Sequence, residues 1–153
     1  MIDDLYSAKI LKLVANIPRA GRLGAPDASS EKVSKLCGSK ITVDIKLEAG
    51  RVSDFAQDVK ACALGQAAAA ILGAAVIGAT PEEIEVARTA LHAMLKAGGA
   101  PPDGRFSELA ILSAVKDYPA RHASTMLAFE AASEAARAAT QAATSRTSRA
   151  GAA

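Results

Sequence analysis

The 153-residue chain contains no tryptophan, two tyrosines and three phenylalanines, although half of its residues are hydrophobic. The core must therefore consist mainly of Ala, Val, Ile and Leu, and few rings remain for the stacking platforms of single-stranded nucleic-acid binders. The charges are nearly balanced, with 18 Lys and Arg against 16 Asp and Glu, so the dense basic face typical of nucleic-acid-binding domains is also missing. We expect no nucleic-acid partner.

Two cysteines are too few for a disulfide framework, and the first 20 residues lack the charged and apolar regions of a secretory leader. We therefore expect a cytoplasmic protein with reduced thiols. The apolar run from Ala61 to Ala79 is short for a membrane span, consists largely of Ala and Gly, and has no Trp or Tyr at its ends. We interpret it as a buried helix and expect no membrane segment.

Hydrophobic periodicity predicts a helix followed by a small sheet. Apolar residues recur at helical spacing over residues 2–17, and strict alternation over 41–47 predicts a strand with one buried face. The segment 48–50 has glycine where a left-handed residue is needed, which indicates a hairpin with an antiparallel return strand over 51–59. A weaker strand is expected over 31–37.

The second half of the chain follows helical spacing throughout. Thr80 opens a capping-box sequence with proline at the first helical position, and a glycine pair at 98–99 ends that helix. Further helices are expected over 61–76, from about Ser107, and over 120–141. The pattern predicts an α+β fold with an N-terminal helix, a three-stranded antiparallel meander, and four helices packed on one face of the sheet.

We expect residues 1–142 to form a single domain. Residues 143–153 are rich in Ala, Ser, Thr and Arg and have little apolar surface to bury, so a disordered tail is predicted there.

The two cysteines are the main candidates for chemistry. Cys37 ends the weak strand and precedes Gly38, whose backbone freedom suits a tight turn and lets another group approach the sulfur. Cys62 lies where the last strand gives way to a helix, and a helix N-terminus with Lys60 nearby favours the thiolate form. The alternative is that both are small buried hydrophobic residues. No C-x-x-C or H-x-x-x-H pair is present, so spacing alone does not identify a metal site.

His122 and Asp58 are further candidates. His122 stands in the first turns of the last helix, near where other loops are expected to converge, and is a candidate ligand. Asp54 and Asp58 lie four residues apart on one strand and share a face, which suits either acid–base chemistry or a solvated sheet face. The G-x-S-x-G, P-loop, G-x-G-x-x-G and H-E-x-x-H signatures are absent.

Several segments together resemble the U-type iron–sulfur cluster assembly scaffolds IscU, SufU and the N-terminal domain of NifU. That family has an N-P-R-N-x-G loop, a C-G-D loop, an x-V-x-D strand, a second-cysteine helix and an F-P-A-R motif. Similar segments occur here in the same order over residues 16–21, 36–39, 51–55, 62–67 and 118–121. The resemblance extends from about Asp4 to Ala139 and implies the fold predicted above, with the cysteines at one exposed end. It also implies a protein that receives sulfur from a cysteine desulfurase, combines it with iron and passes a cluster to acceptor apoproteins.

Two positions depart from this family at its ligands. Ser39 stands in place of the aspartate of C-G-D, and Ser124 stands where a third cysteine is expected. A serine hydroxyl is a poor ligand for iron or zinc near neutral pH, because its proton is hard to remove. A [2Fe–2S] cluster takes four ligands, mostly thiolates, so Cys37 and Cys62 alone cannot complete one within a single chain.

Three outcomes follow from these departures. Two chains could pool four thiolates as a homodimer, or the fold could act without metal. In the remaining outcome neighbouring side chains fill the missing positions as extra ligands, the candidates being Asp58, His122, Ser39 and Ser124.

Our leading hypothesis is a non-enzymatic scaffold or carrier of an iron–sulfur cluster, most simply [2Fe–2S], with iron alone or zinc as alternative metals. Cys37 and Cys62 would be its thiolate ligands or persulfide acceptors. One alternative is a regulatory protein that binds a desulfurase or another partner without metal. Another is a sulfur-relay protein that uses Cys62 as its nucleophile.

Overall fold

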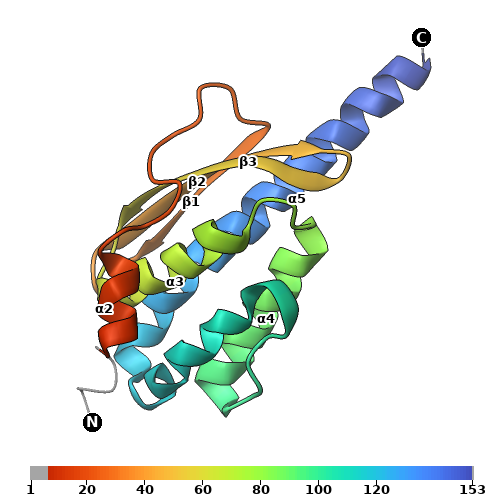
Figure 1. Cartoon of the computed structure of the whole chain (residues 1–153). Helices are drawn as coiled ribbons and strands as arrows, with labels where there is room; N and C mark the ends of the chain where they lie inside the picture. The colour runs from red at the N-terminus through yellow and green to blue at the C-terminus, as the bar shows by residue number, and fades with distance from the viewer. Residues whose placement is uncertain (1–6, 153) are drawn as a thin grey trace.

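The computed structural model describes the backbone of residues 7–152 and the burial and side-chain contacts of residues 7–144. A short helix precedes three strands, and the rest of the chain is helical (Figure 1). The elements are α2 (Ala8–Val14), β1 (Ala28–Ser34), β2 (Ser39–Glu48), β3 (Arg51–Lys60), α3 (Ala63–Ala75), α4 (Pro81–Ala97), the 3₁₀ helices η1 (Gly104–Asp117) and η2 (Pro119–Arg121), and α5 (His122–Ala152).

The three strands form an antiparallel sheet in the order β1-β2-β3. Ala49 and Gly50 connect β2 to β3, and both have positive φ angles, 54° and 78°. Two consecutive left-handed residues are what a two-residue hairpin turn requires, because the twist of such a turn matches that of the strands. The left-handed glycine predicted at position 50 is confirmed, in a loop one residue shorter than expected.

The helices cover one face of the sheet in two layers. Helix α5 contacts β1 and β2, and α3 contacts β3, so these two helices lie directly on the sheet. Helix α4 and η1 pack on the far side of α3 and α5 (Figure 1). This arrangement confirms the predicted α+β fold. The core between the layers is mainly aliphatic, and its largest fully buried side chains are Phe55, Phe129, Ile10, Ile41, Ile45, Leu64, Ile71, Leu72, Ile84, Leu91 and Met94.

The segment between α2 and β1 covers the other face of the sheet. It is held by Asp44, a fully buried carboxylate on β2 that accepts hydrogen bonds from the Arg22 guanidinium (2.6 and 3.0 Å), the Leu23 amide (3.0 Å) and the Ser29 hydroxyl. The hydrogen bonds from Arg22 are the main reason that the pKa of Asp44 falls to about 2. A buried carboxylate with this many donors stays ionised and fixes the loop against the strand.

The boundaries of several elements differ from those predicted. The first strand ends at Ser34, whereas 31–37 was expected, because residues 35–38 form a turn that returns the chain to β2. The helix expected over 2–17 is described from Ala8 to Val14 only, and residues 2–6 lie outside the described residues. Helix α5 continues past the expected end at residue 141 to Ala152. The domain boundary after residue 142 and a disordered tail beyond it stay predictions.

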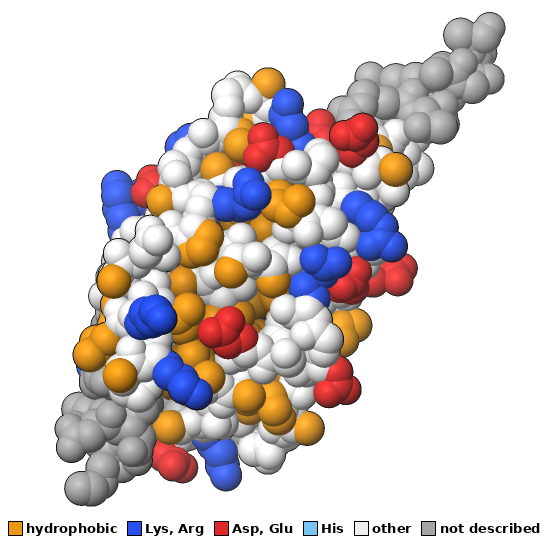
Figure 2. Space-filling model, viewed as in Figure 1, with side chains coloured by type: hydrophobic (Ala, Val, Ile, Leu, Met, Phe, Trp, Pro, Cys, Tyr) orange, Lys and Arg blue, Asp and Glu red, His pale blue; other side chains and the backbone are white. Residues whose placement is uncertain are grey.

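Charged side chains of both signs are interspersed over the face seen in Figure 2. Among the described residues, no helix combines the length and the hydrophobicity that a membrane crossing requires.

Candidate functional site: two cysteines and three buried serines

Cys37 lies in the turn between β1 and β2. Gly38 has a φ angle of 70°, and its amide donates to the carbonyl of Ser34 (2.9 Å), so the turn places Cys37 at the end of the sheet. The Cys37 side chain is half-buried. Its Sγ lies 3.4 Å from the Ser34 Oγ and 3.2 Å from the Ser39 Oγ. Two hydroxyls therefore contact the first sulfur.

Cys62 is the N-cap residue of α3 and follows β3 almost directly. Its amide donates to the Ser39 Oγ (3.3 Å), and its Sγ lies 3.3 Å from the Ser124 Oγ. The side chain is half-buried and packs against the edge of the hydrophobic core. The predicted position at the start of a helix is confirmed.

Ser39 and Ser124 join the two cysteines into one site. Ser39 contacts the sulfur of Cys37 and the amide of Cys62, and Ser124 contacts the sulfur of Cys62 and contributes to the electrostatics of Cys37. Both serines are almost completely buried, with exposed fractions of 2% and 0%. Two cysteines that are 25 positions apart in the sequence thus share Ser39 and Ser124 at the end of the molecule where α3 and α5 both begin (Figure 1).

Gly65 allows α5 to approach α3 closely enough for this contact. A Cβ atom at position 65 would lie 3.0 Å from the backbone oxygen of Ser124 and 2.9 Å from the Cβ of Ala61. Any larger residue would push the start of α5 away. The Ser124 hydroxyl is further fixed by donating to the carbonyl of Arg121 (3.2 Å).

The hydroxyls lower the pKa of Cys37 to about 7. Ser34 contributes most, followed by the side chain of Ser39, with smaller contributions from the Ser39 backbone and Ser124, while burial acts in the opposite direction. Hydrogen bonds to a thiolate favour the charged form, so Cys37 is substantially ionised near neutral pH.

Ser34 was not among the residues predicted for the site. Because the weak strand was expected to run through residue 37, the turn that the structure has over residues 35–38 was not predicted to begin at Ser34. Serine is favoured at the first position of a turn, and Gly38, whose positive φ closes this turn, was the other signal available in the sequence.

His122 lies near the site but is directed toward η1. Its Nε2 is 2.9 Å from the carbonyl oxygen of Val115 and 3.1 Å from that of Lys116, and the ring is 4% exposed. Its Nδ1 is buried and has no hydrogen-bond partner in the described part of the chain. The ring therefore closes the end of η1 in this structure, and its use as a metal ligand stays a prediction.

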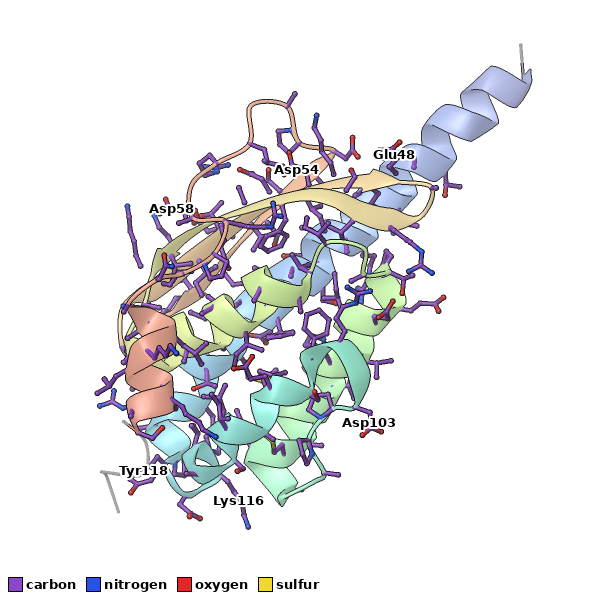
Figure 3. All side chains as sticks on the ribbon, viewed as in Figure 1. Glu48, Asp54, Asp58, Asp103, Lys116 and Tyr118 are labelled. Carbon is purple, nitrogen blue, oxygen red and sulfur yellow. The ribbon has the colours of Figure 1, made fainter. Side chains whose placement is uncertain are left out.

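Asp58 lies on the opposite face of the sheet from the serines. It pairs with Thr42 in the β2–β3 register, whereas Ser39 shares the other face of β2 with Ile41. Figure 3 shows Asp58, with Asp54, on the side of the sheet away from the helices. The structure thus does not bring Asp58 together with the two cysteines, and its role as an extra ligand also stays a prediction.

The donor set does not fit a four-ligand metal site within one chain. Among the described residues, no group of three or more His, Cys, Asp or Glu side chains gathers at one place. The site offers two thiols and three hydroxyls, and a neutral hydroxyl neither balances the charge of a metal ion nor binds it strongly near neutral pH.

Comparison with known proteins agrees with the fold. The NifU-like N terminal domain family matches residues 5–125. The iron–sulfur cluster assembly scaffold protein IscU of Thermotoga maritima is 29% identical over 131 residues, covering 86% of this chain and 92% of that protein. The chain therefore belongs to the NifU-like N-terminal domain family.

Two solved structures are similar over nearly their whole length. The N-terminal part of a nitrogen-fixing NifU-like protein from Brucella abortus has a TM-score of 0.89 and 47% identity, covering 92% of this chain and 97% of that one. A SUF-system scaffold protein from Fervidobacterium islandicum has a TM-score of 0.80 with 19% identity, covering 88% and 98% of the two chains. The second likeness concerns the fold alone.

Proposed function

We propose that this chain takes part in iron–sulfur cluster assembly as a non-enzymatic scaffold or carrier, and that it receives sulfur and iron at Cys37 and Cys62. The observation that carries the proposal is that the two cysteines share Ser39 and Ser124 at one end of the fold. Both cysteines are half-buried, so a donor and an acceptor can reach them. Membership of the NifU-like family and the scaffold relatives support the same proposal.

The ligand count gives this proposal a specific form. Two thiolates cover half of the coordination that a [2Fe–2S] cluster takes. The other ligands therefore come from outside the chain, either from a second copy in a homodimer or from the acceptor apoprotein that takes the cluster. The sulfur donor would be a cysteine desulfurase. Reduced thiols of this kind persist in the cytoplasm, where we expect the protein to act.

A second candidate function is favoured by the two hydroxyls at the ligand positions. Ser39 and Ser124 both have hydrogen-bond partners within the site, which supports a function that needs no metal at these two positions. In this second function the chain binds a desulfurase or another partner and regulates it.

For the scaffold function, the alternatives to a cluster are iron alone or zinc, bound weakly by the two thiolates.

Anaerobic reconstitution tests the proposal. The reduced full chain is incubated with ferrous iron and sulfide, and its iron content, visible absorption and oligomeric state are measured beside Cys37→Ala and Cys62→Ala. We expect colour in the wild type, loss of colour in both variants, and a coloured species that contains two chains or that forms only when an acceptor is present. Uncoloured wild-type protein that still binds a desulfurase would favour the regulatory function.

A further inference from the structure

A groove with a volume of about 320 Å³ lies between the first turns of α4 and the start of η1. Its apolar lining comes from the side chains of Val86, Ala87, Pro102 and Phe106. Val86 is 65% exposed, whereas the other three are buried. Exposed valines are common on protein surfaces, but this one forms the wall of a hollow that is large enough for a ligand side chain.

The groove lies far from the two cysteines. Arg105 lines it and donates from Nη1 to the carbonyls of Ala75 and Ile77, each 2.9 Å away, at the C-terminal end of α3. Cys62 stands at the opposite end of that helix. A helix of 13 residues is about 20 Å long, so a molecule in the groove has no need to touch the end of the fold that carries the sulfurs.

The positive charge of Arg105 is balanced within the chain. Its Nε donates to the Glu83 carboxylate (3.1 Å). The same carboxylate accepts a hydrogen bond from the Thr80 amide (3.2 Å) and lies 3.8 Å from the Arg51 guanidinium. Arg105 and Glu83 therefore neutralise each other and leave no net charge for a ligand.

Two carboxylates that line the groove have no such partner. Glu82 and Asp103 are exposed, and neither has a hydrogen bond or an ion pair to any described residue. Asp103 is the N-cap residue of η1, yet its side chain makes no capping hydrogen bond. Figure 3 shows Asp103 on the outer side of the helices, away from the sheet that carries Asp54 and Asp58. The groove thus combines an apolar wall with two uncompensated negative charges.

We propose that this groove docks a basic peptide segment of a partner protein, in which an arginine lays its aliphatic stem on Val86 and its guanidinium beside Glu82 and Asp103. An arginine matches both parts of the groove, because its stem is apolar and its guanidinium forms charge-assisted hydrogen bonds with carboxylates. The space beside Gly104 is open, so the backbone of the segment can approach the start of η1. Docking at this groove goes beyond the proposed function and does not depend on it.

An NMR titration of the isotopically labelled full chain tests the proposal. The probe is a peptide with blocked ends, Gly-Arg-Leu-Arg-Gly, whose leucine supplies a further apolar contact. Binding should shift the amide signals of residues 80–87 and 103–106 selectively. The affinity should fall when the salt concentration is raised from about 0.05 M to about 0.5 M, because the carboxylates are exposed. The same peptide with glutamate in place of arginine should cause no shift at these positions.

Variants of the groove separate the charged contribution from the apolar one. The double variant Glu82→Gln/Asp103→Asn should weaken binding of the basic peptide about tenfold, and Val86→Ser should weaken it about threefold. The matched control Glu108→Gln/Asp117→Asn removes the same charge from exposed positions of η1 outside the groove, and should leave the affinity within about twofold of the wild type. The amide spectrum of each variant also establishes that it is folded.

Several results would overturn the proposal. These are the absence of shifts at the groove, equal binding of the acidic peptide, an affinity that the double variant leaves unchanged, and binding of spermidine as tight as that of the peptide, which would define a site for small cations. Sedimentation of the chain alone covers the remaining occupant. A mass of two chains that is lost in the double variant would assign the groove to a second copy and also overturn the proposal.

The reconstitution experiment keeps the two proposals apart. The double variant Glu82→Gln/Asp103→Asn should take up iron and sulfide to the same extent as the wild type, because both carboxylates lie at the other end of α3 from Cys62. A wild type that binds the peptide but takes up neither iron nor sulfide would refute the scaffold function and leave the docking groove standing. The converse result would refute the groove alone.

Discussion

Alkylation of Cys37 should begin at a lower pH than alkylation of an ordinary cysteine, because the hydroxyls of Ser34 and Ser39 lower its pKa to about 7. At pH 7 about half of Cys37 is thiolate, compared with about 3% for a thiol of ordinary pKa near 8.5. The thiolate fraction is thus about 16-fold larger. A thiolate of lower pKa is less nucleophilic by about fivefold over this range, so the net rate gain at pH 7 is about threefold.

The assay uses the Cys62→Ala background, so that Cys37 is the only thiol. The rate of reaction with iodoacetamide is followed by intact mass from pH 5.5 to pH 9.5, and the midpoint of the rate profile gives the pKa. Ser34→Ala should raise this midpoint, because it removes the largest of the hydrogen bonds that lower the pKa. Ser113→Ala is the matched control, since its exposed hydroxyl bonds only the nearby Ala110 carbonyl.

The midpoint is the decisive quantity, because it does not depend on access to the thiol. A midpoint at or above about 8.5 in the Cys62→Ala protein would refute the reasoning. An unchanged midpoint in Ser34→Ala would show that the hydroxyl does not stabilise the thiolate.

Three further predictions concern stability and metal binding. Asp44→Asn should lower the free energy of unfolding by about 2 kcal/mol in urea titration, whereas Asp54→Asn, with a half-exposed carboxylate, should have little effect. Because the folded pKa of Asp44 is lowered to about 2, this stabilisation should be present above the ordinary aspartate range and be lost as the pH falls toward 2. Gly73→Ala should cost about 2 to 3 kcal/mol, since its Cβ would lie 2.7 Å from a backbone oxygen, while Gly24→Ala has open space and should be nearly neutral. Ser124→Cys adds a third thiol beside the site and should raise zinc affinity in competition with a chromophoric chelator, and unchanged affinity would contradict the geometry.

The elements that local signals determine could be predicted from the sequence. The capping box at Thr80 is present with both of its hydrogen bonds, and Gly98 ends that helix in the left-handed conformation. The alternation over residues 41–47 corresponds to β2, with one face toward the helices. In these cases residues that are close in the sequence determine the helix ends and the strand, so both can be predicted without tertiary contacts.

Features that depend on distant contacts could not be predicted in the same way. Gly65 is an ordinary helix residue in the sequence, and its importance comes from a backbone oxygen of α5 almost 60 positions away. Asp44 sits in an alternating strand at a position that suits solvent, yet Arg22 and the loop bury it. The hydroxyls around Cys37 come from β1, β2 and α5, so the sequence did not indicate them, and the alternative that Cys62 is the nucleophile stays a prediction.

The start of α3 is connected to the Cys37 sulfur through one serine. Cys62 is the N-cap residue of α3, and its amide donates to the Ser39 hydroxyl, which in turn contacts Cys37. Hydrogen bonds in series polarise one another, so the partial positive charge of the helix extends through one serine to the far cysteine. A negative charge that develops on the Cys37 sulfur is therefore connected to the start of α3 through two hydrogen bonds in series.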